Sequence, residues 1–158
     1  MKAASISELK TEMKTLTAPQ LMDLCLHLAK YKKENKELLS YLLFEAQNEA
    51  LYVKDVKEIM DQAFAEVNRH YMFQTKKQIR KILRDTTKHI KYSGKKETEV
   101  ELLIYFCQKM KKSGIRFDTN VPLTTLYNRQ LLKIGKVITQ LHEDLQHDFM
   151  EEVRSLLD

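Results

Sequence analysis

The chain has 158 residues, about one domain in length, and a formal net charge of +5. Only 3 Gly and 2 Pro occur, which is too few for the turns of a hairpin-rich β protein and indicates an all-helical one. No apolar run follows the first lysine, and the longest apolar block, residues 102–107, is far shorter than the roughly 20 residues of a membrane span. We therefore expect a cytoplasmic protein that does not engage membranes.

Helix starts are marked from the N-terminus onward. Ser5 with Glu8, and Thr17 with Gln20, have the spacing of capping boxes, in which a hydroxyl and a side chain three residues later satisfy free backbone N–H groups. These signals and the apolar periodicity predict helices over residues 5–15, 18–32, 35–47, 50–70, 74–92, 97–112 and 120–157, with a second interpretation in which the last one breaks near Gln146.

Two helix ends and one further start carry their own signals. Gly94 and Gly114 each follow a lysine-rich stretch, as left-handed C-terminal caps do. Asn120, followed by Pro122, predicts the start of the last long helix, since proline is tolerated in a first turn.

Two predicted helices are more apolar than the rest. Residues 97–112 present apolar side chains in nearly all directions, and a helix of this kind is a buried one. Residues 37–46 are nearly as apolar, so we expect the amphipathic helices to pack around these two. Cys25 and Cys107 lie in apolar helical patterns without a CxxC spacing, and we expect both to be buried, reduced thiols.

Parts of the chain resemble each other. "HLAKYKKENKELLSY" (27–41) aligns with "HIKYSGKKETEVELLIY" (89–105), and "LYVKDVKEI" (51–59) with "LYNRQLLKI" (126–134). The order of segments is kept, which predicts an internal duplication with three-helix units at 17–70 and 74–142. We expect one domain, 1–158, of six or seven antiparallel helices. The two units would stack as a short α–α superhelix, or the helices would form a compact bundle.

No constellation in the chain predicts catalysis. There is no glycine-rich phosphate loop, GxSxG or HExxH motif. His142 and His147 are five residues apart, about 140° around a helix, and cannot share a metal ion. Asp144 and His147 form half of a di-iron motif, but no second half exists. We therefore predict a protein that is not an enzyme, with no catalytic residue, no metal site and no cofactor.

One predicted helix has an unusual charge distribution. Residues 73–96 contain nine Lys or Arg and one acid, Asp85, whereas residues 143–158 are strongly acidic. At about 100° per residue, isoleucines gather on one side of the helix and cations on the other. The candidate site for an anion or partner is this cationic side: Lys76, Lys77, Arg80, Lys81, Arg84, Lys88 and Lys91.

Three interpretations of this cationic side stay open. Acidic residues elsewhere in the fold, including the C-terminal segment 143–158, neutralise it within the chain. Alternatively, it binds phosphates of DNA or RNA. The third interpretation is a docking surface for an acidic protein partner, or a plain solvent-exposed surface. Tyr92 is the only aromatic residue that the wheel places near the cations, so base stacking is not expected, and any nucleic-acid binding would lack sequence preference. We favour a non-enzymatic interaction module that binds an acidic partner or its own acidic tail, with nucleic-acid binding as the alternative. The end faces of a two-unit repeat leave homo-oligomerisation open.

The stretches "KYKKENKELLSYLLFEA" (30–46) and "KYSGKKETEVELLIYFC" (91–107) resemble those of short all-helical bacterial proteins known as conserved hypothetical families. The likeness covers most of the chain and contains no residue that marks an activity. It implies a bacterial, cytoplasmic, all-helical protein and no particular mechanism.

Overall fold

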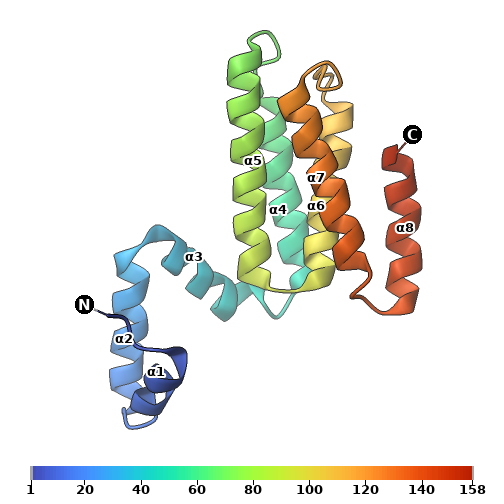
Figure 1. Cartoon of the computed structure of the whole chain (residues 1–158). Helices are drawn as coiled ribbons and strands as arrows, with labels where there is room; N and C mark the ends of the chain where they lie inside the picture. The colour runs from blue at the N-terminus through green and yellow to red at the C-terminus, as the bar shows by residue number, and fades with distance from the viewer. Residues whose placement is uncertain (1, 158) are drawn as a thin grey trace. The chain divides into compact units, whose positions relative to one another are not determined.

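The computed structural model describes residues 2–157, which are 79% helical and contain no strand (Figure 1). The all-α prediction is confirmed. The number of helices is eight in this part of the chain, so the prediction of six or seven is wrong. The additional helix arises because the segment 120–157 is divided into α7 (Val121–Ile138) and α8 (Glu143–Leu157).

The division falls at Thr139, not near Gln146. The Thr139 hydroxyl and the Gln140 amide both donate to the Lys136 carbonyl, at 2.8 and 3.3 Å. Side-chain donors thus satisfy a carbonyl that the next helical turn would otherwise use, and α7 ends there.

The chain divides into two compact units, residues 1–44 and 45–158. The first contains α1 (Ile6–Met13), α2 (Ala18–Tyr31) and α3 (Lys33–Ser40), and a π-helical turn, η1 (Tyr41–Glu45), follows α3. Both predicted capping boxes are present: Ser5 caps α1 with Glu8, and Thr17 caps α2 with Gln20. Asn120 caps α7 as predicted.

The first unit has almost no core. Tyr41 is its one buried residue in the described part. Leu42, Leu43 and Phe44 are 56, 57 and 78% exposed, so the prediction that residues 37–46 form a central helix is wrong. Cys25 is also exposed rather than buried. An apolar composition indicates that a segment needs another segment to pack against. Within this unit no segment covers Leu42, Leu43 and Phe44.

The second unit contains α4 (Glu49–Ala65), α5 (Met72–Ser93), α6 (Lys96–Lys112), α7 and α8. The central helix is α6, which packs against α4, α5, α7 and α8. This confirms the prediction that residues 97–112 are buried on all sides. Its buried residues are Thr98, Val100, Leu102, Leu103, Ile104, Phe106, Cys107 and Met110.

Glu49 ties the start of α4 to the turn between α5 and α6. Its carboxylate accepts hydrogen bonds from the hydroxyls of Ser93 and Thr98, and it lies 3.1 Å from the Lys95 ammonium. Gly94 in this turn has a φ of +67°, and Gly114 after α6 has +73°, so both predicted left-handed caps are confirmed. The geometry of the turn holds the C-terminal end of α5 in place.

The boundary between the two compact units, between residues 44 and 45, lies inside the first predicted repeat, 17–70. The single-domain organisation and the duplication both remain predictions. None of the helices in residues 2–157 is long and apolar enough to cross a membrane.

Candidate functional site: a basic face on helix α5

The inner side of α5 is anchored in the second unit. Ile79 is fully buried, and Ile82 and Ile90 are each 6% exposed, facing the neighbouring helices α4 and α6. Thr86 is buried on the same side and donates its hydroxyl to the Ile82 carbonyl at 2.9 Å. Buried threonines therefore add no unsatisfied polar group, and the apolar side fixes which residues α5 turns outward.

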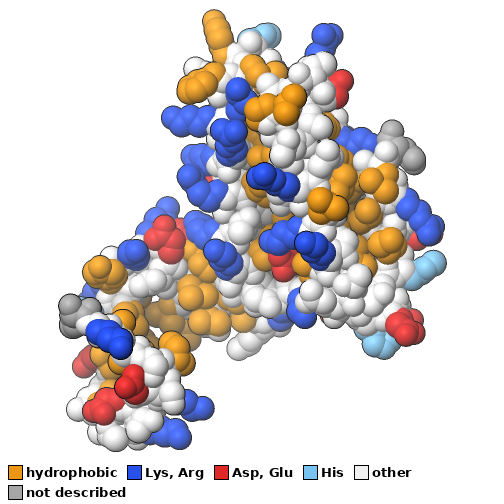
Figure 2. Space-filling model, in the orientation of Figure 1, with side chains coloured by type: hydrophobic (Ala, Val, Ile, Leu, Met, Phe, Trp, Pro, Cys, Tyr) orange, Lys and Arg blue, Asp and Glu red, His pale blue; other side chains and the backbone are white. Residues whose placement is uncertain are grey.

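The outer side carries the seven cations predicted from the sequence, here called the basic face: Lys76, Lys77, Arg80, Lys81, Arg84, Lys88 and Lys91. Five of them are exposed, whereas Lys76 and Lys88 are half-buried. Figure 2 shows Lys and Arg side chains gathered along this helix. The helical wheel therefore places these residues on the correct side of α5.

Six of the seven cations of the basic face are not neutralised within residues 2–157. These six, all except Lys88, make no ion pair and no side-chain hydrogen bond there. The Lys88 ammonium lies 6.0 Å from the centre of the Tyr92 ring, a cation–π contact. Asp85, the one acid of α5, is half-buried and lines a small hollow with residues of α4, including Met60. Within residues 2–157 it makes no ion pair with any of these cations.

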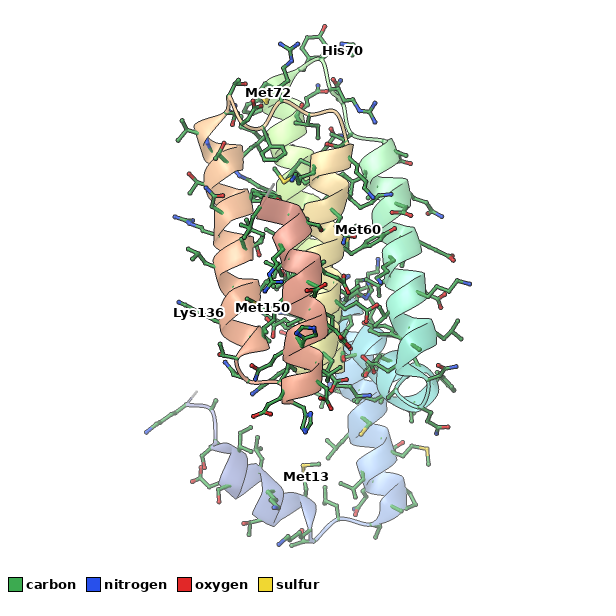
Figure 3. The ribbon with its side chains drawn as sticks, turned by 90° about the vertical axis from the view of Figure 1, so that its right-hand side faces the viewer. Met13, Met60, His70, Met72, Lys136 and Met150 are labelled. Carbon is green, nitrogen blue, oxygen red and sulfur yellow. The ribbon has the colours of Figure 1, made fainter. Side chains whose placement is uncertain are left out.

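The acidic C-terminal helix lies against other helices. α8 packs on α6 and α7, and Figure 3 shows α8, which carries Met150, beside α7, which carries Lys136. Glu151 pairs with Arg154 at 3.1 Å, and Asp144 lies 3.5 Å from His142. In the part of the chain that the structure describes, no ion pair joins α8 to α5.

The loop between α4 and α5 is tied to the first turns of α5. The Asn68 side chain accepts hydrogen bonds from the backbone N–H groups of His70 and Tyr71, at 2.9 and 3.0 Å. The Asn68 amide donates to Gln74, and its backbone N–H donates to Gln78. Figure 3 places His70 and Met72 together at this end of the unit. This network fixes the start of α5 and the orientation of the residues that follow.

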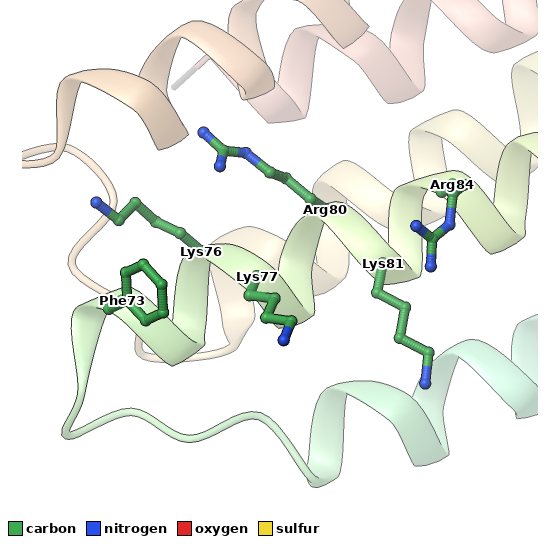
Figure 4. A pocket seen from close by; sticks show the side chains of 6 residues that line it. All are labelled: Phe73, Lys76, Lys77, Arg80, Lys81 and Arg84. Atoms are coloured by element: carbon green, nitrogen blue, oxygen red, sulfur yellow. The ribbon is translucent and has the colours of Figure 1, made fainter.

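A hollow of about 390 Å³ lies along the outer side of α5 and is lined by Phe73, Lys76, Lys77, Arg80, Lys81 and Arg84 (Figure 4). The Phe73 side chain is 78% exposed. The wheel placed only Tyr92 near the cations, and that expectation is wrong. Because the helix was predicted to start at residue 74, Phe73 was left out, whereas α5 begins at Met72. Its i, i+3 and i+7 relation to Lys76 and Arg80 was the signal for its position.

Other ionisable groups form no comparable site. In residues 2–157 no group of three or more His, Cys, Asp or Glu side chains is placed to hold a metal ion. Burial raises the pKa of the Cys107 thiol to about 12, so this cysteine is not a reactive thiolate near neutral pH.

Comparison of the chain with protein-family models, with curated proteins and with solved structures gives no match. The resemblance of residues 30–46 and 91–107 to short helical bacterial proteins therefore remains a prediction. The exposed cations of α5 and the hollow they line with Phe73 are the features that bear on function.

Proposed function

We propose that the chain is a non-enzymatic interaction module, and that the basic face of α5 binds an acidic segment of another protein. One observation carries the proposal. Four exposed cations and the half-buried Lys76 line a single hollow with the exposed Phe73 at one end, and none of the five makes an ion pair within residues 2–157. Protein interfaces are enriched in aromatic residues and arginine at the positions that contribute most to binding, and both occur here.

A separate partner is favoured over the chain's own acidic tail. The exposed acids of α8, among them Glu151 and Glu152, belong to a helix that packs on α6 and α7, where its own Val153 and Leu156 are buried. To reach α5, the helix would have to expose these two apolar residues again. Re-exposing each would cost about 1.5–3 kcal/mol, more than the roughly 0–1 kcal/mol of a surface ion pair.

The second candidate is binding to a nucleic-acid backbone. Lys76, Arg80, Arg84 and Lys88 follow one another at four-residue steps, a rise of about 6 Å each, which suits a row of phosphates. Against it, Phe73 is a single aromatic residue at one end of the row. Proteins that bind single strands use successive aromatic residues to stack successive bases. The isolated aromatic residue fits an anchor for one apolar side chain of a protein better.

Fluorescence anisotropy at low salt tests the proposal. The probes are a labelled Glu/Asp-rich peptide with one leucine, the same peptide with alanine in place of the leucine, and duplex and single-stranded oligonucleotides. We expect the leucine peptide to bind most tightly. The Arg80→Glu/Arg84→Glu variant should lose at least about tenfold in affinity, because it reverses two charges inside the hollow. The matched control is Lys112→Glu/Lys136→Glu, which changes the net charge equally at exposed lysines of α6 and α7.

The Phe73→Ser variant separates the two candidates. Under the proposal it removes the preference for leucine over alanine in the peptide. If the oligonucleotides bind instead, with a slope of about −5 in log K against log salt and no effect of Phe73→Ser, the second candidate replaces the first. No binding of any probe at low salt contradicts both.

We also propose that the chain contains two related three-helix segments, 17–70 and 74–142. The support is the alignment of residues 27–41 with 89–105 and of 51–59 with 126–134. Sequences of relatives test it, because the same positions should match within each of them. Divergence of the two segments toward unrelated patterns would contradict it.

A further inference from the structure

The hollow on the outer side of α5 is a groove between two rows of side chains. Its lining residues divide into two sets with a spacing of four residues, here called the Lys77 row (Phe73, Lys77 and Lys81) and the Arg80 row (Lys76, Arg80 and Arg84). Residues four apart on a helix form a ridge, and two adjacent ridges enclose a groove. In Figure 4 the two lysines of the Lys77 row point to one side of α5, whereas Lys76 and Arg80 point to the other. The two rows therefore leave the strip between them uncovered.

The walls of this groove combine apolar stems with charged ends. Lysine and arginine have three or four methylene groups below the charged group, and these stems pack on apolar surface while the charge stays in water. Phe73 adds an exposed ring at one end of the groove. A ligand in the groove therefore needs an apolar strip toward the stems and acidic groups on both sides of that strip.

The groove also has to accommodate the backbone of its ligand. An extended peptide commonly binds by pairing its N–H and C=O groups with a sheet edge, and residues 2–157 contain no strand. A polyproline segment needs a groove lined by several aromatic residues, and Phe73 is the single aromatic residue in the lining of this one. A helix pairs its own backbone groups and presents side chains to its partner. The groove therefore fits a helix best.

We propose that the acidic partner binds as an α-helix that packs one ridge of side chains, at positions i, i+4 and i+8, into this groove. The inference rests on the proposed function, because it describes how the same face holds its partner. Residues four apart rise about 6 Å on either helix, so such a ridge repeats at the same step as the two rows. One apolar side chain of the ridge contacts Phe73, and the others pack on the stems of the cations.

The same packing determines where the partner carries its acids. On a helix, the positions beside such a ridge are i+3 and i+7 on one side and i+1 and i+5 on the other, each pair about 80° from the ridge. Glutamates at these positions lie toward the Arg80 row on one side and the Lys77 row on the other. Both rows therefore contribute to binding, whereas a ligand that follows a single row would depend on that row alone.

Three labelled peptides of 18 residues test the helix by fluorescence anisotropy at low salt. The first has leucines at i, i+4 and i+8, glutamates at the four flanking positions, and alanine or glutamine elsewhere. The second has the same composition, with the leucines spread around the helix. The third is the first with a proline in the middle of the opposite side. We expect the first to bind at least about tenfold more tightly than the others, because proline breaks the helix and spread leucines form no ridge.

Two variants of the full chain test the two rows. Lys77→Gln/Lys81→Gln and Arg80→Gln/Arg84→Gln each remove two charges from one row. We expect each to weaken binding of the first peptide about fivefold, through the loss of two surface ion pairs. The replaced side chains are all exposed, so the core of the second unit is unchanged. Lys112→Gln/Lys136→Gln, at exposed lysines of α6 and α7, is the matched control and should change the affinity less than about twofold.

The Cα chemical shifts of the isotopically labelled first peptide report its conformation. We expect helical shifts across the leucine ridge in the complex. Extended shifts, equal binding of the three peptides, or dependence on one row alone each overturns the inference, whereas binding of the acidic peptides in any of these cases still supports the proposed function. If none of the acidic peptides binds, the proposed function fails, and the inference fails with it.

Discussion

The Tyr105 hydroxyl on α6 lies 2.8 and 2.9 Å from the two carboxylate oxygens of Asp61 on α4. The Lys109 ammonium lies 2.7 Å from the same carboxylate. Partial burial opposes ionisation of Asp61, but the hydrogen bonds from Lys109 and Tyr105 prevail and lower its pKa. Burial, and then the hydrogen bond to Asp61, raise the pKa of Tyr105 to about 12. This cluster is a polar link between α4 and the central helix.

We expect Tyr105→Phe and Asp61→Ala each to lower the free energy of unfolding by about 1 kcal/mol or more, the typical contribution of a hydrogen bond. Urea unfolding of the two variants and of the double variant measures the coupling. The double variant should lose less than the sum, because both changes remove the same contact. Asp148→Ala, at an exposed acid of α8, is the control and should stay within about 0.5 kcal/mol of wild type. Strict additivity would show that the two side chains do not interact.

Stability should decrease at high pH. Burial raises the pKa of Cys107 from 9.0 to about 12 and, with a smaller contribution from Cys107, that of Tyr127 from 10.0 to about 12. Tyr105 changes in the same direction. A raised pKa means that the unfolded chain releases its proton first. The contribution of these groups is therefore complete below pH 9 and is lost as the pH rises toward 12.

Urea unfolding followed by circular dichroism between pH 8 and 11 checks this decrease. The range extends about one pH unit below the ordinary pKa of a thiol and about one unit above that of a tyrosine. In Cys107→Ala the onset should move up toward the ordinary tyrosine value of 10.0, because the thiol no longer contributes. An onset that does not move in this variant would show that Cys107 ionises equally in both states.

The basic face should make stability depend on salt. Neighbouring like charges four residues apart destabilise a helix by a few tenths of a kcal/mol each, and salt screens them. We expect Arg80→Gln/Arg84→Gln to be about 0.5 kcal/mol more stable than wild type at low salt, and the difference to shrink at high salt. Thermal unfolding of wild type and variant at two salt concentrations measures the stability difference and its dependence on salt. Lys133→Gln is the contrasting control, since Lys133 lies 2.6 Å from Glu99 and its loss should destabilise. A double variant less stable than wild type at low salt would mean that these arginines make a stabilising contact.

Two glycines should respond in opposite directions to alanine. Gly94 has a φ of +67°, where a side chain is strained by about 1–2 kcal/mol even though open space surrounds the position. Gly135 lies inside α7 and also faces open space. We therefore expect Gly94→Ala to destabilise by about 1 kcal/mol and Gly135→Ala to stabilise by about 0.5–1 kcal/mol. Chemical denaturation measures the free energy of unfolding of both variants. If the two substitutions changed it equally, the different backbone conformations given to Gly94 and Gly135 would be wrong.

Local signals in the sequence predicted the features that depend on a few neighbouring residues. The capping boxes at Ser5 and Thr17 and the left-handed caps at Gly94 and Gly114 each follow from side-chain chemistry within one turn. The buried position of α6 follows from apolar residues on all its sides. The outward direction of the basic face follows from the helical period alone.

Features that depend on a distant partner, or on the residue at which a helix begins, were not predictable in this way. The apolar composition of residues 37–46 does not reveal whether another segment covers it, and Phe44 is exposed. The predicted start at residue 74 is two residues later than the observed one, and this excludes Phe73 from the predicted helix. The break after Ile138 depends on the side chains of Thr139 and Gln140, and both residue types also occur inside helices. What binds the basic face depends on a molecule outside the chain.

The central position of α6 also has a consequence for synthesis on the ribosome. α4 and α5 leave the exit tunnel before α6, and although they pack on each other, each also packs on α6. Until α6 has emerged, only α4 is available to cover the apolar side of α5, which includes Ile79 and Ile82. The core of the second unit is therefore complete only after α6 has been synthesised, and a chaperone that shields nascent apolar helices would meet α4 and α5 before then.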